Sequence, residues 1–131
     1  MPADHSDRRV ILAVDDAPEN LQVLKGSLAS EFIVKLAING MVALKIAAKA
    51  SIDLILLDIN MPGMVGYEVC RRLKEDDRTA PIPVIFLTAE LDAQSRTRGL
   101  QAGAVDYVTK PIDPGALVAV INQHLIMENS E

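Results

Sequence analysis

The sequence is poor in aromatic residues, and basic residues do not dominate its charge. It contains no tryptophan, two tyrosines and two phenylalanines, too few to build a platform on which nucleic-acid bases stack. The thirteen basic residues are scattered along the chain and the net charge is −5, so no basic stripe is available for a phosphate backbone. We therefore expect no direct binding to nucleic acid.

Cysteine is almost absent, and so are long apolar runs. The one cysteine, Cys70, excludes an internal disulfide bond and is compatible with a reducing compartment. It lies in a helical pattern, so we expect a packed thiol rather than a reactive one. No apolar run approaches the roughly 20 residues that span a bilayer, and residues 1–9 lack the apolar region of a signal peptide. These absences predict a cytoplasmic protein with no membrane segment.

Hydrophobic residues are plentiful, since they make up 50% of the 131 residues. A chain of this length buries about 68% of the surface that its unfolded form exposes, so one domain with a full core is expected. No internal repeat, linker or low-complexity segment divides the sequence. We predict a flexible N-terminus at residues 1–8, one domain at residues 9–127 and a short tail at residues 128–131.

The stretch from residue 53 to residue 63 reads DLILLDINMPG and contains the most informative pattern. The apolar run from Leu54 to Leu57 is bounded by turn residues, which favours a strand buried on both faces of a parallel sheet. Asp58 follows at the carboxyl end of that strand, where open α/β sheets bind their ligands. Asp58 is therefore the first candidate for a chemical role.

Apolar runs alternate with helical patterns along the chain. Strands are predicted at residues 9–14, 32–37, 54–57, 81–88 and 105–109. Helices are predicted at residues 18–28, 42–50, 67–73, 92–103 and 114–127. Residues suited to helix ends are Pro18, Asn39, Asp92, Gly103, Asp113 and Pro114. The alternation predicts a single-domain α/β fold, a doubly wound parallel sheet of five strands with five helices on its two faces.

Polar side chains stand at the carboxyl ends of four predicted strands. They are Asp15 and Asp16 after the first strand, Asp58 after the third, Thr88 after the fourth and Lys110 after the fifth. In a parallel sheet these ends share one edge, so the five side chains can converge. Three crowded carboxylates resist ionisation unless a positive charge intervenes, and Mg²⁺ favours a few carboxylates with waters and phosphate oxygens. The cluster predicts a magnesium site that handles phosphate.

Each member of this cluster has an ordinary explanation when it is taken alone. Asp15 or Asp16 would serve as the cap of the first helix, although only one of two adjacent acids can do so. Thr88 would be a strand-end threonine, and Lys110 would be a solvated lysine. The coincidence of all of them at successive strand ends is what favours a shared site.

Four motifs together resemble a known family. They are VDD at residues 14–16, LLDINMPGMVGYE at 56–68, FLTA at 86–89 and DYVTKP at 106–111. In this order and spacing they resemble the receiver domain of two-component response regulators, over nearly the whole chain. The resemblance implies a flavodoxin-like fold with sheet order 2-1-3-4-5. It also implies a signalling domain that phosphorylates and dephosphorylates itself, rather than an enzyme that turns over a separate substrate.

The resemblance assigns roles to the residues of the predicted site. Asp58 matches the acceptor of a phosphoryl group from a sensor kinase histidine. Asp16, Asp58 and the backbone carbonyl of Asn60 match the ligands of Mg²⁺, and Asp15 matches an acid that reaches the metal through water. Asn60 and Glu90 flank the site and could orient an attacking water, so we expect the acyl phosphate to hydrolyse in minutes or less.

Other positions match the switch of this family. Thr88 and Lys110 match the residues that grip the phosphoryl oxygens. Thr88 and Tyr107 match a pair that moves on phosphorylation, in which the aromatic ring fills the space that the threonine vacates. The bond between Lys110 and Pro111 matches one that is usually cis. The implied switch surface consists of the fourth predicted helix, the fifth strand and the last helix.

The resemblance implies a sensor histidine kinase or a phosphotransfer protein as the partner. A homodimer through the switch surface, and an output domain missing from this chain, are further expectations. In the last predicted helix, Val118, Ile126 and Met127 are apolar beyond the buried face, either by chance or because they form a dimer or partner face. His124 in the same helix is expected to be a partly buried structural residue rather than a metal ligand.

Two other classes of function are alternatives at this point. A Mg²⁺-dependent phosphohydrolase with an aspartyl-phosphate intermediate usually carries a second acid two residues after the nucleophile, where this chain has Asn60, and it needs a substrate cap. A flavodoxin-type cofactor binder carries a glycine- or hydroxyl-rich phosphate loop where this chain has Asp15 and Asp16. Both alternatives are disfavoured by these differences.

Overall fold

The computed structural model describes residues 8–59, 66–89 and 93–129, and for residues 93–96 and 126–129 it describes the backbone. The strands are β1 (Val10–Val14), β2 (Ile33–Ala37), β3 (Leu54–Asp58), β4 (Val84–Thr88) and β5 (Asp106–Thr109). The helices are α2 (Pro18–Leu28), α3 (Gly40–Lys49), α4 (Gly66–Glu75), α5 (Ala93–Ala102) and α6 (Pro114–Asn129). None of these helices has both the length and the apolar character that a bilayer crossing requires, as far as the described residues extend.

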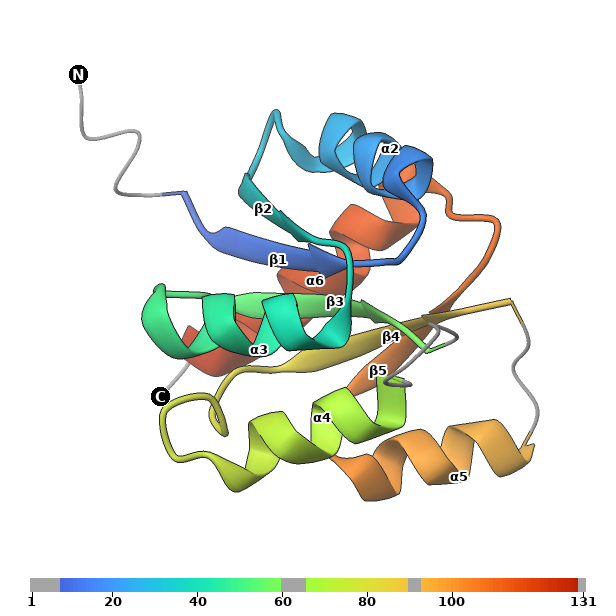
Figure 1. The fold of residues 1–131 in the computed structure, drawn as a ribbon. Helices are drawn as coiled ribbons and strands as arrows, with labels where there is room; N and C mark the ends of the chain where they lie inside the picture. The colour runs from blue at the N-terminus through green and yellow to red at the C-terminus, as the bar shows by residue number, and fades with distance from the viewer. Residues whose placement is uncertain (1–7, 60–65, 90–92, 130–131) are drawn as a thin grey trace.

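The five strands form one parallel sheet in the order β2-β1-β3-β4-β5. Helices α2 and α6 cover one face of the sheet, and α3, α4 and α5 lie on the other face (Figure 1). Parallel neighbours need long crossovers, which helices supply here. The predicted doubly wound α/β fold and its strand order are therefore confirmed.

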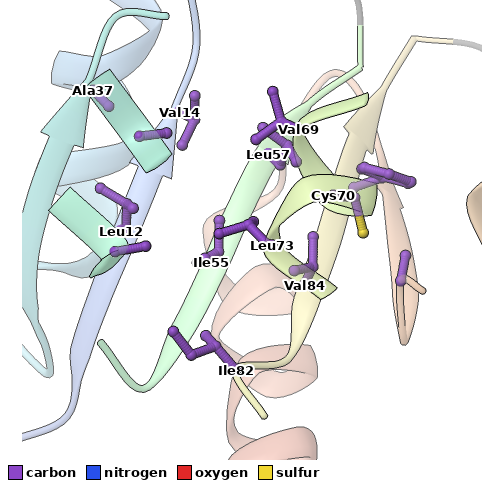
Figure 2. Packing of buried hydrophobic residues seen from close by; sticks show 14 of the residues in the cluster. Leu12, Val14, Ala37, Ile55, Leu57, Val69, Cys70, Leu73, Ile82 and Val84 are labelled. Atoms are coloured by element: carbon purple, nitrogen blue, oxygen red, sulfur yellow. The ribbon is translucent and has the colours of Figure 1, made fainter. Parts of the chain in front are cut away.

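Strand β3 lies in the middle of the sheet, and all five of its residues are buried. Its side chains alternate between the two hydrophobic cores of the molecule. Leu54 and Leu56 belong to the core with α2 and α6, whereas Ile55 and Leu57 belong to the core with α3 and α4 (Figure 2). A strand between two helical layers needs a continuous apolar run, because each such side chain contributes about 1.5–3 kcal/mol when it is fully buried.

Capping interactions begin and end several helices where the sequence predicts. Pro18 is the first residue of α2, and the Asn39 side chain accepts a hydrogen bond from an amide in the first turn of α3. Asp113 accepts one from the first turn of α6, at 3.0 Å. Gly103 follows α5 with a φ of 111°, a left-handed conformation that favours glycine. The predicted cap at Asp92 lies outside the described residues.

The predicted start of the fourth strand is wrong, because β4 begins at Val84 rather than at residue 81. Pro81 and Pro83 have no amide hydrogen to donate to a neighbouring strand. A turn precedes the strand instead, in which the amide of Ile82 donates to the carbonyl of Thr79 at 3.0 Å. The other bounds agree with the predicted ones to within about two residues, which is the ordinary uncertainty of helix and strand ends.

Two residues that the sequence singles out have structural roles, as predicted. Cys70 is fully buried and its thiol donates to the Ala102 carbonyl at 3.3 Å. Burial raises the pKa of this thiol to about 11, so the reactive thiolate is disfavoured. His124 is partly buried in α6, and its Nε2 lies 2.9 Å from the Asp106 carboxylate of β5.

Candidate functional site

The carboxyl ends of β1, β3, β4 and β5 meet at one edge of the sheet and bring the predicted polar residues together. Asp58 and Thr88 are the last residues of β3 and β4, and each is only 4% exposed. Asp15 follows β1 and is 1% exposed, whereas its neighbour Asp16 is exposed. Lys110 follows β5 and is partly buried. We call these five residues the acidic edge.

The three carboxylates of the acidic edge are close enough to share a cation. One oxygen from each of Asp15, Asp16 and Asp58 lies within 4.8 Å of the other two. Carboxylates at this spacing repel one another unless a positive charge lies nearby. Hard oxygen ligands, with room for water, are what Mg²⁺ prefers. The donor set of this cluster therefore fits a magnesium ion.

Lys110 brings a positive charge to the acidic edge. Its Nζ lies 3.2 Å from Asp58 Oδ1 and 3.6 Å from Asp15 Oδ2, so one ammonium group bridges two buried acids. Its backbone amide donates to the Thr88 carbonyl at 2.7 Å, which ties the end of β5 to the end of β4. The bond from Lys110 to Pro111 is cis. An ammonium group in this place can neutralise charge on a phosphoryl group beside Asp58.

Asp15 has two further hydrogen-bond donors, both from the start of α2. The amide of Ala17 donates to Oδ1 at 3.0 Å, and the side-chain amide of Asn20 donates to Oδ2 at 3.2 Å. The N-cap of α2 is Ala17, so Asp15 is not the cap of this helix and the ordinary explanation for it is wrong. Asn20 was not identified from the sequence. The signal that could have indicated its contact with Asp15 was an amide side chain in the first helical turn after the acid pair.

Gly66 allows α4 to begin against the end of β3. Its amide donates to the Ile59 carbonyl at 2.8 Å. A Cβ atom built on Gly66 would lie 2.7 Å from both the Asp58 carbonyl oxygen and Ile59 Cα, which is too close for any side chain. Sequence reasoning placed this glycine in a loop, but a glycine at a predicted helix start signals a close backbone approach. Gly66 therefore sets the position of α4 next to Asp58.

Tyr107 packs against aromatic side chains of neighbouring elements. It is half-buried in β5, and its ring centroid lies 6.2 Å from that of Phe86 in β4. Phe86 contacts the ring of Tyr67 from α4 edge to face, at 5.4 Å. The guanidinium of Arg98 from α5 lies 4.8 Å from the centre of the Tyr67 ring. These residues form a row of aromatic contacts, the aromatic row, that joins β4 and β5 to α4 and α5.

Two predicted site residues, Asn60 and Glu90, lie outside the described residues. The magnesium-binding carbonyl of Asn60, and the effect of both residues on hydrolysis, stay predictions.

The family model of the response regulator receiver domain matches residues 11–122. The chain belongs to this family. Phosphorylation and binding of Mg²⁺ at an acidic pocket are typical of receiver domains, and the acidic edge contains a cluster of three carboxylates that could hold a metal ion. Family membership decides in favour of a signalling receiver over the phosphohydrolase and the flavodoxin-type binder.

The curated relatives that match are longer than this chain. It is 44% identical over 121 residues to a probable cyclic di-GMP phosphodiesterase of Vibrio cholerae, covering 92% of this chain and 27% of that protein. It is 46% identical over 110 residues to the response regulator PleD of Caulobacter vibrioides, covering 83% of this chain and 24% of that protein. The chain thus spans about a quarter of the length of these relatives.

Solved receiver structures have the same fold. The chemotaxis protein CheY4 of Vibrio cholerae matches with a TM-score of 0.85 and 30% identity, over 88% of this chain and 98% of that one. The receiver domain of the sensor histidine kinase PA1611 of Pseudomonas aeruginosa matches with a TM-score of 0.83 and 31% identity, over 90% and 98%. That second structure has a magnesium ion coordinated in its active-site cleft.

Proposed function

We propose that this receiver accepts a phosphoryl group on Asp58 from a histidine of a sensor kinase or a phosphotransfer protein. The observation that carries the proposal is the contact of Lys110 with Asp58 and Asp15 at an edge where three carboxylates converge. An acid that is buried, paired with an ammonium group and next to a cation site is suited to phosphoryl transfer. Asp58 is the only acid of the edge that ends a strand of the sheet.

The chemistry is a displacement at phosphorus. A carboxylate oxygen of Asp58 forms a bond to phosphorus while the bond from phosphorus to the donor nitrogen breaks, which gives an acyl phosphate on Asp58. Lys110 and Thr88 are assigned to the phosphoryl oxygens. Asp15, Asp16 and Asp58, with the backbone carbonyl of Asn60, would hold Mg²⁺. Bound Mg²⁺ supplies charge neutralisation for the transferred group, because this reaction depends mainly on positioning and electrostatics.

The switch follows from the new acceptor oxygens beside Asp58. Thr88 donates to one of them and moves toward it, and Tyr107 moves into the space that Thr88 leaves. Tyr107 is part of the aromatic row, so its movement alters contacts that reach α5. The surface of α5, β5 and α6 is the proposed readout, and a homodimer through this surface is one use of it. Leu100 and Val105 on this surface are 53% and 42% exposed, which supports an apolar contact there.

The whole protein is proposed to be a cytoplasmic regulator in which residues 9–127 form the receiver unit. One relative of which this chain covers 27% is named a probable cyclic di-GMP phosphodiesterase, which denotes an enzyme, so an output domain is a proposed partner of this receiver. The receiver itself is proposed to have no separate substrate.

Mass spectrometry after incubation with acetyl phosphate and Mg²⁺ tests the acceptor. The chain is expected to gain one phosphoryl group, and the variant Asp58→Asn is expected to gain none, because its side chain has no nucleophilic carboxylate. Chelation of Mg²⁺ should also prevent the gain.

The variant Asp77→Asn is a matched control for this experiment. Asp77 is an exposed acid in the turn after α4, on the way to the amino end of β4, and its loss should leave phosphorylation unchanged. Phosphorylation of Asp58→Asn to the same extent as the control would contradict the assignment of Asp58.

A further inference from the structure

We propose that Asn20 is a positioning residue of the phosphorylation site, because its side-chain amide holds Asp15 in place and leaves Lys110 available to Asp58. The inference rests on the proposed function of the acidic edge and adds a residue from α2 to it. Asn20 lies in the first turn of this helix and is exposed, so it is accessible from solvent at the mouth of the site. With Asp15 and Lys110 it lines a cavity of about 280 Å³.

The hydrogen bonds of Asp15 give the geometric basis. Oδ1 accepts from the amide of Ala17 at 3.0 Å, and Oδ2 accepts from Asn20 Nδ2 at 3.2 Å. These two donors fix the plane of a carboxylate that is 1% exposed. A buried carboxylate that lost a donor would turn toward another one, since leaving it unsatisfied is costly.

Lys110 is the donor that Asp15 would turn to. Its Nζ lies 3.6 Å from the same oxygen, Oδ2, that Asn20 binds, and 3.2 Å from Asp58 Oδ1. With Asn20 present, Asp15 is satisfied by amide groups and the ammonium lies closer to Asp58. Without Asn20, the strongest remaining donor for Oδ2 is Lys110, and its movement toward Asp15 takes it away from Asp58.

The charge of the donor matters as much as its position. An amide satisfies the hydrogen-bonding capacity of Asp15 without cancelling its charge, whereas a tight ion pair with Lys110 cancels it. The three carboxylates bind a divalent cation through that charge. Asn20 therefore supports metal binding and phosphoryl acceptance together, as residues that bind a metal ligand from behind generally do.

The local sequence explains how Asn20 reaches back to Asp15. Pro18 begins α2 and fixes the backbone angle of the first turn. Side chains of a helix tilt toward its amino end, so a residue in this turn extends over the segment that precedes the helix. The amide of Asn20 donates to the carbonyl of Ala17 at 3.0 Å, which holds the turn closed.

The test compares three variants of the whole chain. Asn20→Leu keeps the branched shape of the side chain but removes the donor, and Asn20→Gln keeps an amide. Gln22→Leu removes an exposed amide two residues further along the same helix. Titration calorimetry with Mg²⁺ should give a dissociation constant about tenfold higher for Asn20→Leu. The rate of phosphorylation by acetyl phosphate at saturating Mg²⁺ should also fall about tenfold. Asn20→Gln should recover part of both losses, and Gln22→Leu should match the unchanged chain.

The outcomes separate this inference from the proposed function. If Asn20→Leu lowers thermal stability but leaves the Mg²⁺ dissociation constant and the phosphorylation rate unchanged, its role is structural and the inference is overturned. If the unchanged chain accepts no phosphoryl group, the proposed function fails, and the Mg²⁺ titration alone still decides whether Asn20 positions Asp15. Equal losses in Asn20→Leu and Gln22→Leu would also overturn the inference.

Discussion

At the scale of single residues, the acidic edge carries more negative than positive charge. Three carboxylates from Asp15, Asp16 and Asp58 face one ammonium group from Lys110. Two of these acids are almost fully buried, where charges are poorly screened by solvent. A bound Mg²⁺ would therefore neutralise the edge together with Lys110, and a residue that shifts Lys110 between two acids is expected to affect both metal binding and phosphoryl acceptance.

Cys70 gives a prediction at this scale, because its pKa is raised from 9.0 to about 11. Burial is the main cause, and the nearby Lys74 opposes it. The folded thiol stays protonated at a pH where the unfolded thiol ionises, so its contribution is complete below pH 9.0 and is lost as pH rises to about 11. The free energy of unfolding, measured with urea, should fall more between pH 8 and pH 10.5 in the unchanged chain than in Cys70→Ala.

The comparison with Cys70→Ala removes the effect of lysines and tyrosines that titrate in the same range, since both chains contain them. An equal fall in the two chains would show that Cys70 does not contribute.

At the scale of secondary-structure elements, α5 is held by the aromatic row through two successive residues. Arg98 lies over the ring of Tyr67. A Cβ atom built on Gly99 would lie 2.5 Å from the Tyr107 hydroxyl oxygen and 2.9 Å from the ring of Phe86. A glycine inside a helix is unfavourable by about 0.5–1 kcal/mol relative to alanine, so close packing of Tyr107 accounts for its presence in α5.

The pair Gly99→Ala and Gly26→Ala tests this explanation. Gly26 lies inside α2 and a Cβ atom on it would meet nothing within 4 Å, so alanine there should stabilise the chain by about 0.5–1 kcal/mol. Gly99→Ala gains the same helix propensity but must displace Tyr107 or Phe86, and overpacking of this kind costs about 1–3 kcal/mol. Urea unfolding should show opposite changes in stability. Equal stabilisation by both substitutions would exclude close packing at Gly99.

Elements could be predicted from the sequence where one local pattern decided them. The short apolar run before Asp58, bounded by turn residues, favoured a buried strand, and Asn39 and Asp113 are residue types that cap helices. The predicted start of β4 was wrong because the apolar residues around Pro81 continue the strand pattern, although a proline cannot donate a hydrogen bond to the ladder. Val118 was predicted to lie beyond the buried face of its helix, but it is half-buried against the core of α2 and α6.

The acidic edge could be predicted because the ends of parallel strands always share an edge. The roles of Asn20 and Gly66 could not be predicted in the same way, because each role depends on how two elements are placed relative to one another. The link from Asn20 to Asp15 depends on the angle at which α2 leaves β1, and the need for Gly66 depends on the approach of α4 to β3. A local sequence pattern predicts neither the angle of α2 nor the approach of α4.

At the scale of the whole molecule, the two ends of the proposed switch lie on different parts of the sheet. The acidic edge lies at the carboxyl ends of the strands. The readout surface of α5, β5 and α6 lies at the lateral side of the sheet that β5 forms (Figure 1). Tyr107 belongs to β5, one of the two edge strands of the sheet, and the aromatic row reaches from it to α4. The proposed movement of Tyr107 would therefore be passed to α4 and α5 through these ring contacts.

The proposed homodimer can be tested with two substitutions of equal exposure. Leu100 on α5 is 53% exposed and Met41 on α3 is 51% exposed. Leu100→Glu should weaken dimers of the phosphorylated chain about tenfold or more, since burying one leucine contributes about 1.5–3 kcal/mol. Met41→Glu, on a helix outside the readout surface, should leave the dimer intact. Light scattering measures the mass of each species, and both variants should still accept the phosphoryl group.

A chain that remains monomeric after phosphorylation, or that loses its dimer equally in both variants, would contradict a dimer through α5, β5 and α6.

The strand order has a consequence for the time at which this protein can begin to signal. Lys110 and Asp58 meet although 52 residues separate them in the sequence, and Lys110 follows the last strand of the sheet. Contacts of such long range form late in folding, because the entropy of closing the chain must first be offset. A chain still emerging from the ribosome can contain Asp58, the proposed acceptor, before Lys110 has been added. An unfinished chain is therefore not expected to accept a phosphoryl group at the proposed site.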